Sequence, residues 1–134
     1  MNKIEHIGIA VKDLEVSNKV FKALFGNAHY KTEMVESEHV ITSFFKSGPN
    51  KIELLQATDI DSPIAKFIEK KGEGIHHIAF AVENIEQEIE RLTKEGLEFI
   101  NKTPKKGADN KLIAFLHPRS TNGVLIELCQ EIPS

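Results

Sequence analysis

The sequence lacks the features that would place the protein in a membrane, in an oxidising compartment or on nucleic acid. Its 134 residues include one cysteine, Cys129, which excludes an internal disulfide and leads us to expect a cytoplasmic location. No run of about 18 or more apolar residues is present. We therefore expect neither a membrane span nor a secretory leader. The net charge of −3 gives no general attraction to nucleic acid.

The remaining composition is that of an ordinary globular chain. Hydrophobic residues make up 40% of the sequence, enough for a sizeable core, and no stretch is of low complexity. We therefore expect a single domain that binds no nucleic acid and no membrane. Although the net charge is slightly negative, the last third of the chain contains a basic region, formed by Lys102, Lys105, Lys106, Lys111 and Arg119.

The chain contains an internal duplication. Residues 6–15 (HIGIAVKDLE) return as residues 77–86 (HIAFAVENIE), and residues 52–56 (IELLQ) return as residues 126–130 (IELCQ). Each half therefore begins with a segment that carries one histidine and ends with a segment that carries one glutamate. Such self-similarity at a fixed spacing indicates two copies of one structural unit.

The first segment of each copy has the pattern of a strand with two unlike faces. Alternate side chains of a strand point to opposite sides, so residues 6, 8 and 10 share one face and residues 7, 9 and 11 share the other. The first face carries His6, Gly8 and Ala10, and its small residues leave room above the histidine. The second face is apolar and should be covered by a helix. In the second copy His77, Ala79 and Ala81 repeat the first face.

Capping residues delimit three helices. Asp13 should begin a helix over 14–24 that ends at Gly26, with inward side chains at Val16, Val20, Phe21 and Leu24. Ser62-Pro63 should begin a second helix that ends at Gly72, with Ile64, Phe67 and Ile68 inward. Asn84 and Gln87 resemble a capping box for a third helix that ends at Gly96, with Ile85, Ile89 and Leu92 inward.

Further strands are predicted over 39–45, 51–56, 97–101, 112–116 and 124–130. The predicted fold is α+β, a single domain over 1–134 made of two β-α-β-β-β modules, repeat 1 over about 3–58 and repeat 2 over about 74–131. The two modules should form a curved mixed sheet around a metal-containing cleft, with the small-residue faces inward and the helices outside.

Four residues at equivalent positions of the duplication form a candidate metal site: His6, Glu53, His77 and Glu127. The glutamates interrupt otherwise apolar strands, where a buried carboxylate needs a partner. Two imidazoles and two carboxylates suit one divalent first-row ion, with Co²⁺ expected first and Ni²⁺, Mn²⁺ or Zn²⁺ as alternatives. Of the two adjacent histidines, His77 aligns with His6, and His76 must point the other way.

The paired modules, each with one histidine and one glutamate, resemble the vicinal oxygen chelate superfamily (the glyoxalase and bleomycin resistance superfamily). Within it, nearly the whole chain looks like a methylmalonyl-CoA epimerase. The segments that carry the resemblance are 6–11, 62–67, 72–80, the His-Pro-Arg-Ser segment 117–120 and 123–128. The segments 62–67, 72–80 and 117–120 are the more specific ones.

The resemblance implies an isomerase that interconverts the 2R and 2S forms of methylmalonyl-CoA through a metal-stabilised enolate. Inversion at carbon requires two acid/base groups on opposite sides of the substrate. Glu127 matches one family residue. The second family glutamate is absent, with Thr42 or Ser43 near its place, so we assign Glu53 to this role as a hypothesis. The resemblance also implies an acyl-CoA substrate and a homodimer.

The sequence leaves the surroundings of this site open. Lys105, Lys106, Lys111 and Arg119 match either a CoA phosphate site or an ordinary solvated loop. His117 either orients a ligand or caps a turn, and we expect the capping role. Cys129 lies two residues after Glu127 and can line the same face; no base is placed to make it a nucleophile.

Three other functions share the four-ligand pattern or the fold. Glyoxalase I (lactoylglutathione lyase) uses the same ligands on a glutathione hemithioacetal, although its usual Asp-Pro turn before the final strand is replaced here by residues 120–123. An extradiol dioxygenase would hold Fe(II) by two histidines and one carboxylate, and a fourth ligand would block a position that oxygen needs. A metal-free small-molecule-binding relative would have no use for four retained ligands.

Overall fold

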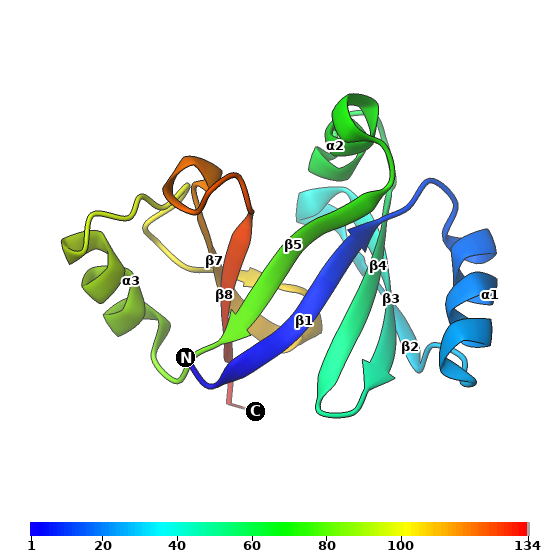
Figure 1. The fold of residues 1–134 in the computed structure, drawn as a ribbon, viewed down its shortest axis with the longest axis horizontal. Helices are drawn as coiled ribbons and strands as arrows, with labels where there is room; N and C mark the ends of the chain where they lie inside the picture. The colour runs from blue at the N-terminus through cyan, green and yellow to red at the C-terminus, as the bar shows by residue number, and fades with distance from the viewer. Residues whose placement is uncertain (134) are drawn as a thin grey trace. The chain divides into compact units, whose positions relative to one another are not determined.

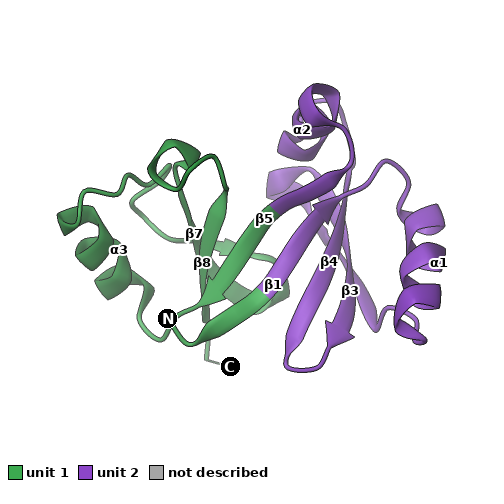
Figure 2. Ribbon diagram, viewed as in Figure 1, with its two compact units in different colours: residues 1–5, 77–134 green, residues 6–76 purple. Residues whose placement is uncertain are grey.

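A computed structural model describes residues 1–133 of the chain, which form two compact units. Unit 2 comprises residues 6–76, and unit 1 comprises residues 1–5 together with the chain from residue 77 onward (Figure 2). The first and the fifth strand each continue from one unit into the other along the chain.

Unit 2 contains a four-stranded sheet and two helices (Figure 1). Its elements are β1 (Lys3–Ala10, in this unit from residue 6), α1 (Leu14–Phe25), β2 (Lys31–Val35), β3 (Val40–Ser47), β4 (Asn50–Ala57) and α2 (Pro63–Lys71). The strand order is β2-β3-β4-β1. Strand β1 runs parallel to β4, and the other two pairings are antiparallel.

Unit 1 repeats this plan without a second helix. Its elements are β5 (Gly74–Ala81, in this unit from residue 77), α3 (Ile85–Lys94), β6 (Lys105–Gly107), β7 (Lys111–Leu116) and β8 (Ile126–Glu131). The strand order is β5-β8-β7-β6, with β5 parallel to β8 and the other pairings antiparallel. The prediction of an α+β fold built from two β-α-β-β-β modules is therefore confirmed.

Helix α1 begins and ends at the predicted residues but buries a different face. Asp13 Oδ1 accepts a hydrogen bond from the Val16 amide at 3.1 Å, and Gly26 ends the helix with φ 76°. The inward residues are Leu14, Phe21 and Phe25, which pack with Ile9, Val11, Phe45 and Leu54.

The prediction of Val16, Val20 and Leu24 as inward residues is wrong, because these side chains are 57–68% exposed. Successive helical residues are about 100° apart, so residues 16, 20 and 24 form a second apolar stripe about 120° around the helix from the first. The sequence contains both stripes and does not show which one packs.

Helix α2 covers part of the unit 2 sheet on the face opposite to the one that α1 covers. Ser62 Oγ accepts a hydrogen bond from the Ile64 amide at 3.1 Å and so begins the helix as predicted. Ile64 is buried with Ala10, Val40 and Leu55, and further apolar side chains pack against this cluster, namely Val35, Ala57, Phe67 and Ile68. Ala10 lies on the same face of β1 as His6, so α2 closes one end of the face that carries this histidine.

Helix α3 forms the main core of unit 1. Asn84 Oδ1 accepts a hydrogen bond from the Gln87 amide at 3.1 Å, as the capping residues predicted. Ile85, Ile89 and Leu92 are buried against β7 and β8. Within residues 1–133, no helix combines the length and the apolar character that crossing a membrane requires.

The strand predictions require correction at three places. The segment 97–101 is not a strand, because only Ile100 donates a hydrogen bond to β7, at the Phe115 carbonyl. Leu97 donates instead to the Leu92 carbonyl at the end of α3, and Glu98 donates to Ser120 Oγ at 2.9 Å. A single bridge joins Phe99 to Leu116. Strands β2 and β6 were not predicted. In the three-residue β6, Gly107 lies so close to Ile113 that a Cβ atom would meet its side chain at 2.7 Å.

Candidate active site

The parallel pairing of β1 with β4 brings the first histidine and the first glutamate together in unit 2. Gly8 lies opposite Glu53 in this pairing, and His6 precedes Gly8 by two residues, so all three side-chain positions share one face. His6 Nδ1 lies 3.2 Å from Glu53 Oε2. Both residues are buried, at 5% and 4% exposure.

Unit 1 repeats this arrangement in the pairing of β5 with β8. Ala79 lies opposite Glu127 in the parallel pairing of β5 with β8, and His77 precedes Ala79 by two residues. His77 Nε2 lies 3.4 Å from Glu127 Oε1, and both residues are buried. The duplication is therefore preserved in the strand register as well as in the sequence.

Each unit thus holds one imidazole beside one carboxylate in a largely dry environment. A buried carboxylate is costly unless it is paired, hydrogen-bonded or bound to a metal. Imidazole nitrogen and carboxylate oxygen are both ligands of divalent first-row ions. The donor set of either pair fits such an ion, and within each unit the structure brings the predicted histidine and glutamate together.

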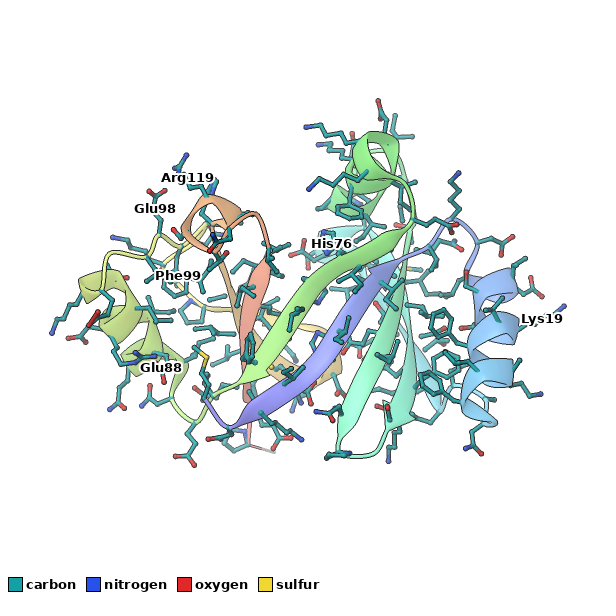
Figure 3. The ribbon with its side chains drawn as sticks, viewed as in Figure 1. Lys19, His76, Glu88, Glu98, Phe99 and Arg119 are labelled. Carbon is teal, nitrogen blue, oxygen red and sulfur yellow. The ribbon has the colours of Figure 1, made fainter. Side chains whose placement is uncertain are left out.

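His76 takes no part in the unit 1 pair. The ring of His76, which is labelled in Figure 3, packs edge-on against Phe67 of α2, with ring centroids 5.0 Å apart. Burial lowers the pKa of His76 from 6.5 to about 4, because a buried site disfavours the charged imidazolium. His76 is therefore neutral at physiological pH, and it is His77 that lies beside Glu127, as the alignment with His6 predicted.

The structure distinguishes the two residues that stand near the place of the missing family glutamate. Phe44 lies opposite Glu53 in the pairing of β3 with β4. Thr42 therefore shares the face of Glu53, whereas Ser43 points toward the core under α1. Both are buried, and Ser43 Oγ makes no hydrogen bond to any described residue. No carboxylate of β3 is available on the Glu53 face of unit 2, since the strand itself contains none.

The His-Pro-Arg-Ser segment ties the loop before β8 to residue 98. His117 Nδ1 accepts a hydrogen bond from the Arg119 amide at 3.2 Å, which is the capping role that the sequence favoured. Arg119 forms an exposed ion pair with Glu98 (Figure 3). This hydrogen-bonded pairing lowers the pKa of the Glu98 carboxyl and raises that of the Arg119 guanidinium. Glu98 and Ser120 therefore join the segment to the 97–101 region.

The basic residues of the last third of the chain differ in burial. Lys105 and Lys106 are exposed on β6, as expected of a solvated segment. Lys111 is only 6% exposed, which the sequence did not indicate. Cys129 is buried at 1% exposure, and its thiol donates a hydrogen bond to the Phe80 carbonyl at 3.6 Å. The strand register places both residues on the Glu127 face of unit 1.

Comparison with known proteins gives one consistent family. The family model of the Glyoxalase/Bleomycin resistance protein/Dioxygenase superfamily matches residues 5–115. An uncharacterised protein of Bacillus subtilis is 41% identical over 97% of this chain and 93% of its own length. The ethylmalonyl-CoA/methylmalonyl-CoA epimerase of Cereibacter sphaeroides is 40% identical over 97% of this chain and 98% of its own length.

Solved structures agree with these relatives. A variant of the methylmalonyl-CoA epimerase of Streptomyces coelicolor, in complex with 2-nitronate-propionyl-CoA, superposes with a TM-score of 0.93 at 32% identity and covers 98% of this chain and 95% of that one. The resemblance drawn from the sequence motifs is therefore confirmed. The chain belongs to the Glyoxalase/Bleomycin resistance protein/Dioxygenase superfamily and, within it, to the methylmalonyl-CoA epimerase family.

Proposed function

We propose that the protein is a metal-dependent epimerase that interconverts the 2R and 2S forms of methylmalonyl-CoA. The observation that carries the proposal is the pair of buried histidine–glutamate contacts at equivalent register positions of the two units. Relatives at 33–40% identity are named as epimerases of this substrate, and solved relatives contain CoA thioesters.

The proposed ligands of one divalent ion are His6, Glu53, His77 and Glu127, with Co²⁺ as the first candidate and Ni²⁺, Mn²⁺ or Zn²⁺ as alternatives. A bound ion would supply Lewis-acid stabilisation of the negative charge that develops on the substrate. The support is the chemistry of the donor set, in which two imidazoles and two carboxylates leave coordination positions for a substrate.

Glu127 and Glu53 are the proposed acid/base groups. The C2–H bond between the carboxylate and the thioester is acidified by the thioester carbonyl. One glutamate, as the carboxylate, takes the C2 proton, and the electron pair of the C–H bond moves toward the thioester oxygen. The other glutamate, which carries a proton at the start of the turnover, returns it to the opposite side of C2. Each carboxylate is a ligand that must loosen to accept a proton. The absence of a glutamate at Thr42 leaves Glu53 as the group for the second role.

Isotope exchange with separate epimers tests this assignment. Cobalt-loaded protein is incubated in D₂O with either the 2R or the 2S thioester, and deuterium at C2 and inversion are followed separately. The wild type should exchange and invert both epimers. Glu127→Gln should lose inversion by about 10²–10⁴-fold and lose exchange for one epimer while retaining it for the other. Glu53→Gln should show the opposite selectivity.

The matched control is Glu95→Gln, which changes an exposed carboxylate at the end of α3 and should leave both rates unchanged. Loss of exchange for both epimers in Glu127→Gln alone would remove Glu53 from the second role. No exchange of either epimer by fully metallated wild type would overturn the epimerase, and turnover of methylglyoxal with glutathione would then identify a glyoxalase I.

We further propose a cytoplasmic homodimer. The lone cysteine supports a reducing compartment, and the dimer rests on the family resemblance.

A further inference from the structure

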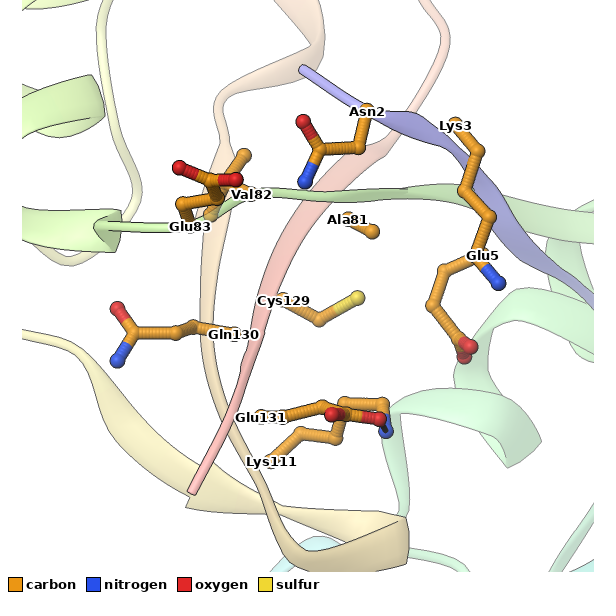
Figure 4. A pocket seen from close by; sticks show the side chains of 10 residues that line it. All are labelled: Asn2, Lys3, Glu5, Ala81, Val82, Glu83, Lys111, Cys129, Gln130 and Glu131. Atoms are coloured by element: carbon orange, nitrogen blue, oxygen red, sulfur yellow. Dashed lines mark ion pairs between the residues drawn. The ribbon is translucent and has the colours of Figure 1, made fainter. Parts of the chain in front are cut away.

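Unit 1 contains a cavity of about 370 Å³, a size typical of small-molecule sites. It lies between the first residues of β1, the ends of β5 and β8 and the start of β7 (Figure 4). Three of its polar or sulfur-bearing lining residues are buried: Glu5, Lys111 and Cys129, at 5%, 6% and 1% exposure. Figure 4 shows their side chains arranged around the same space.

The duplication identifies what occupies the same place in unit 2. The strand registers match four cavity residues, Ala81, Lys111, Cys129 and Glu131, with Ala10, Val40, Leu55 and Ala57 in that order. These four counterparts belong to the apolar cluster beneath α2. Glu5 likewise corresponds to His76, which packs against Phe67 of α2. The cavity is therefore the place that α2 fills in the other copy, and no helix follows β8 within residues 1–133.

Lys111 gives this space a polar character that its counterpart Val40 lacks. Its ammonium lies 3.7 Å from both Asp109 Oδ2 and Glu131 Oε1. Hydrogen bonds to nitrogen donors are about 2.7–3.2 Å long, so neither carboxylate accepts one from Lys111. A buried ammonium with three donors is stabilised by an accepting oxygen, and the cavity beside it is where a ligand could place one.

The charges around the cavity select the kind of ligand. Lys3 and Lys111 are outnumbered by the carboxylates of Glu5, Glu83 and Glu131. A free phosphate or carboxylate would meet net repulsion here. A neutral chain that carries amide groups suits the site better, because its carbonyls can accept from lysine and its N–H groups can donate to the carboxylates. Ala81 provides apolar contact for the methylene groups of such a chain.

The cavity adjoins the Glu127 side of the active site. Phe115, Ile113 and Lys111 lie opposite Glu127, Cys129 and Glu131 in the pairing of β7 with β8, so the three pairs share one face. Because a strand rises about 3.4 Å per residue, Cys129 lies about 7 Å and Glu131 about 14 Å along β8 from Glu127. A substrate whose reacting carbon lies at Glu127 could thus place a more distant group beside Lys111.

We propose that this cavity binds the pantetheine arm of the acyl-CoA substrate, with an amide carbonyl of the arm accepting a hydrogen bond from Lys111 and an amide N–H donating to a carboxylate of the wall. The proposal rests on the proposed epimerase function. It adds a binding subsite that exists only in unit 1, because the corresponding place in unit 2 is filled by Ile64 and Phe67 of α2.

The test compares three thioesters of methylmalonate: with CoA, with pantetheine alone, and with ethanethiol, which has no amide. The variants copy the other repeat: Lys111→Val introduces the residue of position 40, and Cys129→Leu introduces that of position 55. The matched control is Lys106→Val, an exposed lysine of the neighbouring strand. Lys111→Met keeps most of the aliphatic stem should the valine variant fail to fold.

A charge-assisted hydrogen bond contributes about 1.5–3 kcal/mol. Lys111→Val and Lys111→Met should therefore lower kcat/KM about 10- to 100-fold for the CoA and pantetheine thioesters, mainly through KM. Both variants should leave the ethanethiol ester within about twofold of wild type. Cys129→Leu, which narrows the cavity, should show the same selectivity for the amide-bearing thioesters. Lys106→Val should change none of the three.

Other outcomes of these assays would contradict different parts of the proposal. Equal losses on all three thioesters would show that Lys111 supports the fold or the reacting end, and would overturn the subsite. A loss confined to the CoA thioester would place Lys111 at the nucleotide instead of the arm. If the wild type turned over no thioester, the proposed function would fail. Calorimetry with pantetheine alone would then test the cavity by itself, and equal affinity for wild type and Lys111→Val would overturn the subsite.

Discussion

Unit 2 and unit 1 hold their histidine–glutamate pairs in the same way but differ in what covers the neighbouring part of the same face. In both units the glutamate lies opposite the residue two positions after the histidine, in a parallel strand pair. Beyond this point α2 seals the face in unit 2, whereas unit 1 has the cavity beside Lys111. The strand framework that fixes the proposed ligands is therefore independent of the element that closes the space beside them.

The shared framework includes the starts of the helices. Gln56 Oε1 accepts a hydrogen bond from the Leu14 amide at 2.6 Å, and Gln130 Oε1 accepts one from the Ile85 amide at 2.8 Å. Each glutamine follows its glutamate by three residues. In each unit a side chain from the glutamate strand thus satisfies the first amide of the helix that follows the histidine strand, which otherwise has no partner. This contact fixes the helix relative to the strand that carries the proposed ligand.

The largest expected effect tests whether the two pairs act on one ion. His6→Ala and His77→Ala should each weaken binding of Co²⁺ by more than about 100-fold, because each removes a proposed ligand and even outer-shell partners cost 10- to 100-fold. Calorimetric titration of metal-free protein measures this. His39→Ala, at an exposed histidine paired with Asp59, is the control. Unchanged affinity in one of the two variants would show that the pairs are not equivalent.

The closure of unit 2 by α2 can be weakened in isolation. Ile64→Ala should lower the free energy of unfolding by about 2–5 kcal/mol, because it leaves a cavity in a buried cluster. Urea denaturation measures the loss. Hydrogen exchange should rise over 40–57 and 63–71 and stay low in α3 and β8. Ile60→Ala, at a side chain that is 85% exposed, should have little effect. Equal loosening of both units would show that α2 supports the whole chain.

Burial beneath α2 also predicts a pH dependence. His76 has a pKa of about 4 when folded and 6.5 when unfolded. The unfolded chain therefore binds the proton first, and stability is lost as the pH falls from 6.5 toward 4. The loss at pH 5 is at most about 2 kcal/mol.

His76→Phe preserves the ring contact and should remove this part of the loss. Urea midpoints of metal-free wild type and variant, compared at pH 7 and pH 5, measure it. An equal loss of stability between pH 7 and pH 5 in both proteins would show that another group causes it.

The smallest expected effect concerns the helix caps, where the two units should behave alike. Asp13→Ala and Asn84→Ala each remove a hydrogen bond of 3.1 Å to an amide in the first turn. Each should cost about 1 kcal/mol in thermal unfolding. Lys19→Ala, on the exposed side of α1 (Figure 3), should cost less. A clear difference between the two caps would show that the helices do not contribute equally to their units.

The predictions that held are those that depend on local patterns and on the repeat. Asp13, Ser62 and Asn84 begin the helices as predicted, because capping is a contact between neighbours in the chain. The pairing of each histidine with its glutamate followed from their equivalent positions in two copies. The segment 97–101 was mispredicted because the amides of Leu97 and Glu98 bond to α3 and to Ser120, which strand propensity cannot register.

The sequence by itself determined the duplicated β-α-β-β-β plan, the capped helices and the identity of the paired histidines and glutamates. Only the tertiary structure decided which apolar stripe of α1 is buried, that Thr42 instead of Ser43 shares the face of Glu53, and that Lys111 lines a cavity. The physical reason is that periodicity and capping act over a few residues. Burial of a face depends on which distant strand or helix lies against it, and α2 provides that cover in one unit only.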